Sequence, residues 1–385
     1  MSSLKFPDGF LWGSATASYQ VEGGIENCDW AKAGRDGKVP EAGLACDFKN
    51  KYKEDLKTAK DLVHNAFRFS IEWASVEPEE GKFDEDAIRF YLDLILEIKK
   101  NGMEPLMTLW HFTLPLWFVE KGGFEKKANI SFFERYCMFV LGRLAGEVFF
   151  VTTINEPMVW VSNGYIRGNW PPFKHTTLKH FDMLKNLALA HNDIYKQAKE
   201  KWQHLSIGYA KDNIYFHAGN MWPWNILLSK YMNWFWNNRF INMTKGHFDH
   251  FGLNYYFHRQ FGGKKQELPK NDFGWEIYPE GIYGLLSDLR QLNVPIYITE
   301  NGLSGVADTQ REHFIVDHLK NIHRAISEGV MVKGYFYWSL LDNFEWAVGY
   351  QQRFGLIEVD FDTQERKIRD SAFVYKDIIE SNTIE

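Results

Sequence analysis

The chain has 385 residues, of which 45% are hydrophobic and 24% are charged, a composition typical of a globular protein with an ample core. Its formal net charge of −6 argues against nucleic acid as a partner, because phosphate binding needs a basic excess. No apolar run reaches the roughly 18 residues of a membrane span, and the first seven residues lack the apolar stretch of a signal peptide.

Two kinds of residue narrow the class of protein further. Aromatic residues make up 17% of the chain, with 15 Trp, and such rings either fill a core or stack on the faces of sugars. Cys28, Cys46 and Cys137 have no metal-ligand spacing, which favours reduced thiols and a cytoplasmic protein. A Cys28–Cys46 disulfide is the less favoured alternative.

A strand followed by a helix recurs along the whole chain. Short apolar runs rich in β-branched and aromatic residues predict eight strands, at 10–14, 66–70, 105–109, 149–154, 206–210, 250–254, 295–299 and 334–339. Helical periodicity lies between them, at 84–100, 132–144, 178–202, 280–292 and 311–328. The clearest is 84–100, with Asp84 as N-cap, Gly102 beyond its end, and one face formed by Ile88, Tyr91, Leu92, Ile95 and Leu96.

This alternation predicts the α/β class, with parallel strands and right-handed crossovers. Eight is the number of strands that closes a (β/α)8 TIM barrel, whose active site lies at the C-terminal ends of the strands. No low-complexity linker divides the sequence, so residues 1–385 are expected to form a single catalytic domain.

Two of the predicted strands end in a glutamate. Glu156 closes the run 149–155 and is followed by Pro157, while Glu300 closes 294–299 and is followed by Asn301 and Gly302. Removing a carboxylate from water costs several kcal/mol, so a buried strand end is a poor place for one without a use. A single glutamate of this kind is more often a charged residue at the edge of a loop than a catalytic residue. Two in matching contexts favour a pair of reactive carboxyls on one barrel rim.

Other polar and aromatic residues also follow the predicted strands. In chain order they are Gln20, Arg68, His111, Asn155, Asn254, Tyr256 and Trp338. The fifth strand ends in Lys211, Asp212 and Asn213, to which no role is assigned. Taken alone, Arg68 has the alternative of pairing with Glu72, and His111 that of a core histidine.

Several motifs occur in a fixed order over nearly the full length. They are FPDGFLWGSATA at 6–17, RFSIEW at 68–73, HFTLPLW at 111–117, TINEP at 153–157, ITENG at 298–302, YWSLLDNFEW at 337–346 and RFGL at 353–356. In this order they resemble the family 1 glycoside hydrolases, the β-glucosidase and β-galactosidase family, and in particular its short prokaryotic and archaeal-type members. The resemblance extends to residues 367–375.

The resemblance implies a retaining exo-β-glycosidase, chiefly a β-glucosidase with β-galactosidase or β-fucosidase side activity. It implies no cofactor or metal, and a small β-glycoside or oligosaccharide as substrate. Glu156 matches the acid/base and Glu300 the nucleophile of a double displacement through a covalent glycosyl-enzyme intermediate. Such enzymes hold two carboxyl groups about 5–5.5 Å apart.

The remaining site residues also come from the resemblance. Arg68 and Tyr256 match positions beside the nucleophile, and Asn155 matches the residue that contacts the sugar 2-hydroxyl. The substrate-binding positions are Gln20, His111, Asn155, Trp338, Glu345 and Trp346, and Trp73 and Asn301 are expected to order the rim. Glu345 also favours a non-phosphorylated substrate, because a carboxylate would repel a phosphate.

Two alternatives to hydrolysis stay open. One is a transglycosylase that uses the same covalent intermediate, and the other is a non-catalytic glycan-binding protein on the same fold, since fold does not imply function. The sequence also leaves open the sugar epimer, the linkage and the oligomeric state.

The sequence departs from the family pattern in places. Ala74 and Ser75 stand where the family usually has Ser-Arg. The chain is shorter between residues 173 and 254 and between 257 and 275, which is expected to widen the entrance on the leaving-group side. Segment 221–240 carries four Trp without a clean apolar face. It is interpreted as a helix packed on the barrel, in preference to an oligomer interface or an exposed patch.

Overall fold

Eight parallel strands close into a barrel in the computed structural model, which describes residues 3–176, 179–265 and 267–385. In order around the barrel they are β10 (Ile296–Asn301), β11 (Val332–Trp338), β2 (Leu11–Ala15), β3 (Ala66–Ser70), β4 (Glu104–Thr108), β5 (Phe150–Asn155), β6 (Ser206–Asp212) and β8 (His250–Asn254). The predicted TIM barrel is confirmed, and each predicted strand overlaps an observed one.

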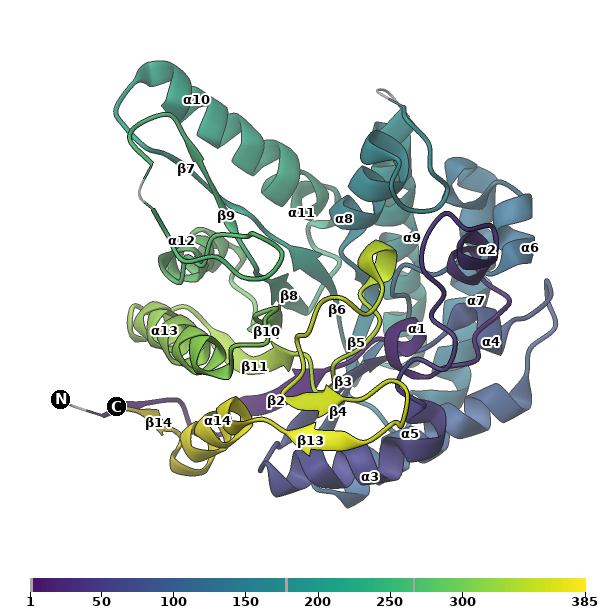
Figure 1. The fold of residues 1–385 in the computed structure, drawn as a ribbon. Coiled ribbons are helices and arrows are strands. Elements are labelled where there is room, and N and C mark those ends of the chain that lie inside the picture. The colour runs from purple at the N-terminus through teal and green to yellow at the C-terminus, as the bar shows by residue number, and fades with distance from the viewer. Residues whose placement is uncertain (1–2, 177–178, 266) are drawn as a thin grey trace.

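A helix follows each barrel strand and covers the outside of the barrel (Figure 1). These helices are α3 (Phe48–Asp61), α5 (Glu85–Lys100), α7 (Ile130–Leu144), α9 (Lys179–Lys201), α11 (Arg239–Thr244), α12 (Glu280–Leu289), α13 (Asp308–Ser327) and α14 (Asp370–Ser381). Residue 178, where the third helix was predicted to begin, lies outside the described residues. The helix predicted over 280–292 ends as a 3-10 turn, Arg290–Leu292, before Asn293 adopts a positive φ.

Helix α5 illustrates how local sequence sets these elements. The Asp84 side chain accepts hydrogen bonds from the amides of Asp86 and Ala87, which satisfies two of the unpaired N–H groups of the first turn. Ile88 and Ile95 are buried as predicted, but Leu96 is 44% exposed. The apolar face is therefore centred closer to Leu94 than the sequence indicated.

Short elements occupy the C-terminal rim of the barrel. They are α1 (Ser18–Val21), α2 (Asp29–Arg35), α4 (Trp73–Val76), α6 (Leu116–Glu120), α8 (Pro157–Val161) and the two-stranded sheet of β12 (Ile357–Val359) and β13 (Arg366–Ile368). At the other end of the molecule, β1 (Leu4–Lys5) pairs with β14 (Thr383–Ile384), so the two chain ends lie side by side (Figure 1).

The chain beyond β6 and β8 continues into a parallel two-stranded ribbon, β7 (Tyr215–Ala218) and β9 (His258–Phe261). Helix α10 (Pro223–Met232) lies along this ribbon and projects away from the barrel (Figure 1). A π-helical turn, Asn233–Asn238, joins α10 to α11.

This arrangement corrects the interpretation of segment 221–240. The packed-helix prediction is wrong for its first part, because Trp222 is 61% exposed and Trp224 is 68% exposed. In the second part it is right for Trp236 and Phe240, which are buried, and wrong for Trp234, which is 47% exposed. The difference arises because α10 packs on the ribbon alone, whereas the later residues reach the barrel.

All three cysteines are buried and unpaired within the described residues, so the alternative of a Cys28–Cys46 disulfide is wrong. The Cys28 sulfur instead accepts a hydrogen bond from the Ala31 amide at the start of α2, and the Cys46 thiol donates to the Asp342 carbonyl. None of the helices in the described residues is both long enough and apolar enough to cross a membrane. The same residues contain no group of three or more His, Cys, Asp and Glu side chains arranged to hold a metal ion.

Candidate active site

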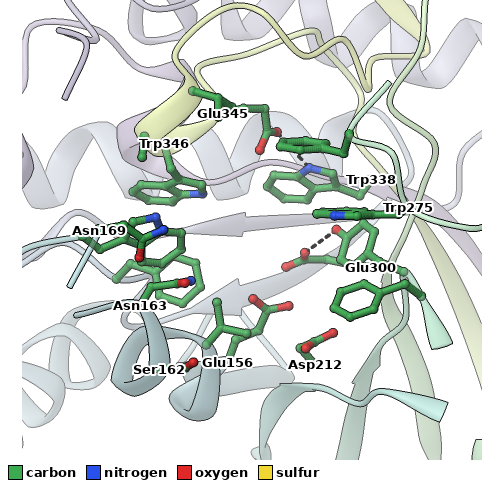
Figure 2. Close-up of a pocket in the computed structure, with 18 of the residues that line it drawn as sticks. Glu156, Ser162, Asn163, Asn169, Asp212, Trp275, Glu300, Trp338, Glu345 and Trp346 are labelled. Carbon is green, nitrogen blue, oxygen red and sulfur yellow. Dashed lines mark hydrogen bonds between the residues drawn. The ribbon is translucent and has the colours of Figure 1, made fainter. Parts of the chain in front are cut away.

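A cavity of about 460 Å³ opens at the C-terminal ends of the barrel strands. Eight of the predicted site residues line it, namely Gln20, His111, Glu156, Tyr256, Glu300, Trp338, Glu345 and Trp346. Figure 2 shows Glu156, Glu300, Trp338, Glu345 and Trp346 arranged around this space. The other two, Arg68 and Asn155, are fully buried immediately behind the lining, where they hydrogen-bond to it.

Glu300, near the end of β10, is held through both carboxylate oxygens. Arg68 Nη1 lies 2.5 Å from Oε1, and the Tyr256 hydroxyl donates to Oε2 at 2.7 Å. A guanidinium and a phenol are both donors, so they stabilise the ionised form of the carboxyl group. This is the form that a nucleophile needs.

The alternative pairing of Arg68 with Glu72 is wrong. Glu72 accepts hydrogen bonds from the hydroxyls of Ser18 and Thr113 and from the Ala74 amide, which caps the short helix α4. Arg68 instead bonds Glu300 through Nη1, and its second nitrogen, Nη2, donates to Asn155 Oδ1 at 2.6 Å.

Asn155 connects Arg68 to His111. Its Nδ2 lies 3.1 Å from Nε2 of His111, and an amide NH₂ can only donate, so Nε2 is the acceptor and His111 is neutral, with its proton on Nδ1. Burial lowers the pKa of His111 well below its ordinary value, and the charge of Arg68 lowers it further. The imidazole ring is nearly parallel to those of Trp338 and Trp346, with centroids 6.0 Å away in each case.

Glu156 lies between β5 and α8 with a φ of 44°, a conformation that residues other than glycine seldom adopt. Its amide donates to the Ala210 carbonyl on β6. Pro157 is the first residue of α8, a position whose backbone N–H has no partner within the helix, so proline loses no hydrogen bond there. Asn254 Nδ2 donates to Glu156 Oε1 at 2.7 Å. Such strained conformations cluster at functional sites, where the surroundings hold them in place.

The surroundings of Glu156 favour its protonated form for a physical reason. Burial raises the pKa of Glu156 well above its ordinary value, and the negative charges of Glu300 and Asp212 raise it further. Arg68 opposes this shift weakly, because its guanidinium bonds Glu300 and not Glu156. The cavity therefore contains one carboxyl, Glu300, bonded by a guanidinium and a phenol, and a second, Glu156, whose surroundings favour the protonated form.

A third carboxyl, Glu345, lies across the cavity from Glu156 (Figure 2). Trp338 Nε1 lies 3.2 Å from its Oε1, and Gln20 Nε2 approaches the same atom at 3.4 Å. Burial raises the pKa of Glu345 to about 8. Gln20 Oε1 is buried and has no hydrogen-bond partner among the described residues, so this end of the cavity contains an acceptor that a ligand hydroxyl could use.

Gly302 shows why the sequence after Glu300 needs a glycine. A Cβ atom at this position would lie 1.8 Å from the Trp338 carbonyl oxygen. The missing side chain therefore lets the end of β10 approach the end of β11, which places Glu300 and Trp338 in the same cavity.

Trp73 and Asn301 do not line the cavity. Trp73 is fully buried, with its indole N–H bonded to Glu77, and it stacks on Tyr136. Asn301 donates to the Tyr255 carbonyl and accepts from the Tyr335 hydroxyl. Asn301 thus links the end of β10 to its neighbours, whereas Trp73 packs between α4 and α7.

Sequence reasoning missed Asp212 as a lining residue and Asn254 as the partner of Glu156. Both residues end barrel strands, β6 and β8, and they are paired in register. Their position at a strand end was the available signal, but only the closed barrel shows that they face Glu156.

Comparisons with known proteins agree with this geometry. The chain matches the family described as Glycosyl hydrolase family 1 over residues 2–248 and 225–384. It is 36% identical to the solved β-glycosidase from Pyrococcus horikoshii, with a TM-score of 0.93, covering 100% of this chain and 97% of that one. It is 32% identical to the β-glucosidase from Thermotoga maritima in complex with glucoimidazole, with a TM-score of 0.94 and coverage of 99% and 100%. It is also 30% identical to a 6-phospho-β-galactosidase from Clostridium acetobutylicum, with 97% of each chain covered.

Proposed function

This chain belongs to Glycosyl hydrolase family 1, and we propose that within the family it is a retaining exo-β-glycosidase that acts on non-phosphorylated β-glycosides, chiefly β-glucosides. The observation that carries the proposal is the contrast between two facing carboxyl groups. Arg68 and Tyr256 bond both oxygens of Glu300, while burial and neighbouring negative charge keep the proton on Glu156.

In the first step, a Glu300 oxygen attacks the anomeric carbon as the bond from that carbon to the leaving oxygen breaks. Glu156 gives its proton to the leaving oxygen, so the aglycone departs as a neutral alcohol. Loss of the negative charge on Glu300 removes one of the causes that raise the pKa of Glu156.

In the second step, Glu156 acts as a base. It takes a proton from water, whose oxygen attacks the anomeric carbon as the bond to Glu300 breaks. Glu156 is then protonated again, Glu300 is again an anion bonded to Arg68 and Tyr256, and the sugar keeps its β configuration.

The terminal sugar is assigned to the end of the cavity formed by Gln20, Trp338 and Glu345. Unpartnered Gln20 Oε1 and the Glu345 carboxyl suit neighbouring hydroxyl groups, and Trp338 offers an aromatic face. Asn155 is proposed to reach the 2-hydroxyl, although its side chain is bonded to Arg68 and His111 in the structure.

Glu345 supports the choice of a non-phosphorylated sugar. Above its pKa of about 8 the Glu345 carboxyl is ionised and would repel a phosphate, and its hydrogen-bond donors among the described residues are the neutral side chains of Trp338 and Gln20. The family relatives include a 6-phospho-β-galactosidase, so the proposed choice is between two substrate classes on one fold.

The experiment compares hydrolysis of p-nitrophenyl β-glucoside, galactoside, fucoside and mannoside, and of the 6-phosphorylated glucoside and galactoside. Wild type is expected to cleave the glucoside fastest and the phosphorylated substrates slowest, and Glu300→Gln is expected to lose turnover by orders of magnitude. A wild type that prefers the phosphorylated substrates refutes the proposed specificity. A wild type inactive on all six refutes the proposed hydrolysis.

A further inference from the structure

Helix α10 and its two ends carry apolar side chains that the described part of the chain leaves exposed. Seven of the fourteen large apolar side chains exposed in the described residues lie in the short segment 221–234. They form the α10 patch, which consists of Met221, Trp222, Trp224, Leu227, Leu228, Tyr231 and Trp234. None of them lines the active-site cavity, so the catalytic mechanism does not explain them. Contiguous apolar patches on a protein surface mark sites of interaction.

Helix α10 is amphipathic, but its apolar face points away from the protein. Within Pro223–Met232, the residues Trp224, Leu227, Leu228 and Tyr231 recur at intervals of three and four, so they share one face of the helix. All four side chains are exposed. Because α10 projects away from the barrel (Figure 1), the barrel does not shield this face.

The opposite side of the helix is polar and faces the protein. Ser229 is buried, and a Cβ atom added at Gly262, just beyond β9, would lie 2.0 Å from Asn225 Nδ2, so Asn225 lies against the end of the ribbon. Just after the helix, Asn233 hydrogen-bonds the Asp288 carboxyl on α12. A surface helix normally buries its apolar face and exposes its polar face. The reversed arrangement of α10 indicates that its apolar face has a partner outside this chain.

The side chains of the α10 patch suit the boundary between a membrane and water. Trp and Tyr combine an apolar ring with a polar N–H or O–H group, and they are enriched at the level of lipid head groups. Four of the seven patch residues are of this type, at positions 222, 224, 231 and 234. Leu227 and Leu228 add aliphatic surface between them. Amphipathic helices of this composition lie in the plane of a membrane surface without crossing it.

The charge of the projecting region favours a membrane that contains anionic lipids. Residues 214–238 and 258–265, which form the ribbon, α10 and the π-helical turn, contain no Asp or Glu. Their charged residues are exposed and basic, namely Lys230, Arg259, Lys264 and Lys265. The whole chain has a net charge of −6, so the basic character is confined to this region. Basic residues beside an apolar helix face are attracted to anionic head groups.

The same charges argue against a second copy of this chain as the partner. Two copies that paired through the α10 patch about a two-fold axis would bring the same basic region of each copy together. Neither copy would supply an acidic partner from this region, and like charges across an interface weaken binding. An anionic lipid surface has no such conflict.

We propose that α10 docks this protein on the surface of a bilayer that contains anionic lipids. The Trp, Tyr and Leu side chains of the α10 patch enter the head-group layer, and Lys230, Lys264 and Lys265 pair with anionic head groups. The barrel stays outside the membrane. Because the patch and the active-site cavity share no residue, this inference does not depend on the proposed glycosidase activity.

The test is co-sedimentation of the purified protein with vesicles of two compositions, phosphatidylcholine alone and equal parts of phosphatidylcholine and phosphatidylglycerol. Wild type is expected to bind the mixed vesicles about tenfold or more tightly than the neutral vesicles. Added salt is expected to reduce this difference, because it screens the attraction between the lysines and the head groups.

Two sets of substitutions separate the apolar contribution from the electrostatic one. The patch variant Trp224→Gln/Leu227→Gln/Leu228→Gln keeps good helix formers and is expected to lower binding to both kinds of vesicle about tenfold or more. The variant Lys264→Gln/Lys265→Gln is expected to lower binding to the mixed vesicles about tenfold and to leave binding to the neutral vesicles unchanged.

Matched controls show whether the location of the side chains matters. The variant Leu44→Gln/Leu96→Gln/Phe373→Gln removes three exposed apolar side chains from separate places in the fold, and Lys57→Gln/Lys60→Gln removes two exposed lysines from α3. Both controls are expected to bind vesicles as wild type does. Thermal unfolding shows that each variant is folded, without reference to glycosidase activity.

The alternative outcomes are distinct. A wild type that binds neither kind of vesicle overturns the inference, and so does an equal loss of binding in the patch variant and its scattered control. Sedimentation equilibrium without lipid tests for a second copy of the chain. A wild-type dimer that dissociates in the patch variant would assign the α10 patch to self-association and overturn the membrane proposal.

Discussion

Arg68 and Glu300 form an ion pair across the barrel that is almost completely buried, with 2.5 Å between Nη1 and Oε1 and side-chain exposures of 1% and 5%. The residues are 232 positions apart in the chain, on β3 and β10. Desolvating two charges is expensive, and further hydrogen bonds to both groups offset part of that cost, while Arg68 Nε has no partner among the described residues. Tyr256 supplies one at Glu300, and Asn155 supplies one at Arg68.

The first prediction concerns Arg68→Lys. Lysine keeps the positive charge but cannot bond Glu300 and Asn155 with two nitrogens of one planar group. We expect kcat/KM for p-nitrophenyl β-glucoside to fall about 10²–10³-fold, as for other losses of preorganised donors. Arg366→Lys is the matched control, because Arg366 forms a forked pair with Asp55 away from the cavity. Equal losses in the two variants would contradict a specific role for Arg68.

The second prediction concerns the pH dependence of activity. Since the pKa of Glu156 is raised, the proton needed for the first step is retained as the pH rises past the ordinary glutamate range and is lost only well above it. We expect kcat/KM to fall at high pH in wild type. In Glu156→Gln this basic limb should disappear, which kcat/KM against pH for a dinitrophenyl β-glucoside would measure. A basic limb that persists in Glu156→Gln would assign it to another group.

The third prediction concerns stability and pH. Glu22 is buried, bonded to the Tyr91 hydroxyl at 3.0 Å, and burial raises its pKa from 4.5 to about 8. Between these values the unfolded chain releases a proton that the folded protein keeps, so the free energy of unfolding falls as pH rises through this range.

Glu22→Gln should reduce this pH-dependent fall in the free energy of unfolding. The reduction is about 1.4 kcal/mol for each unit of difference between the folded and unfolded pKa that the substitution removes. Denaturant unfolding at about pH 5 and about pH 9 measures the change. Glu54→Gln, an exposed position on α3, is the control and should retain the wild-type difference. An unaltered pH dependence in Glu22→Gln would show that other buried carboxyls cause it.

The fourth prediction concerns Gly302. The Cβ of Gly302→Ala would meet the Trp338 carbonyl oxygen at 1.8 Å, so the backbone of β10 or β11 must move. We expect a loss of stability of about 1–3 kcal/mol or more, together with a raised KM because Trp338 is displaced. In Gly305→Ala the new Cβ meets Asp272 at 3.9 Å, an ordinary contact, and little change is expected. Thermal unfolding and steady-state kinetics of both variants provide the measurement.

The sequence by itself determined the barrel and the approximate positions of its strands. Runs such as 66–70 and 250–254 match β3 and β8 in full, because strand and helix periodicity is encoded by neighbouring residues. The glutamates at 156 and 300 were recognisable for the same reason, since each ends a local apolar run.

Only the tertiary structure decided which side chains meet. It paired Arg68 with Glu300 and not with the nearby Glu72, bonded Asn254 to Glu156, and turned Asp212 into the cavity. It also exposed Trp222 and Trp224 on a helix that the barrel does not cover. These contacts join segments that are distant in the chain, so closure of the barrel creates them and no local pattern of residues encodes them.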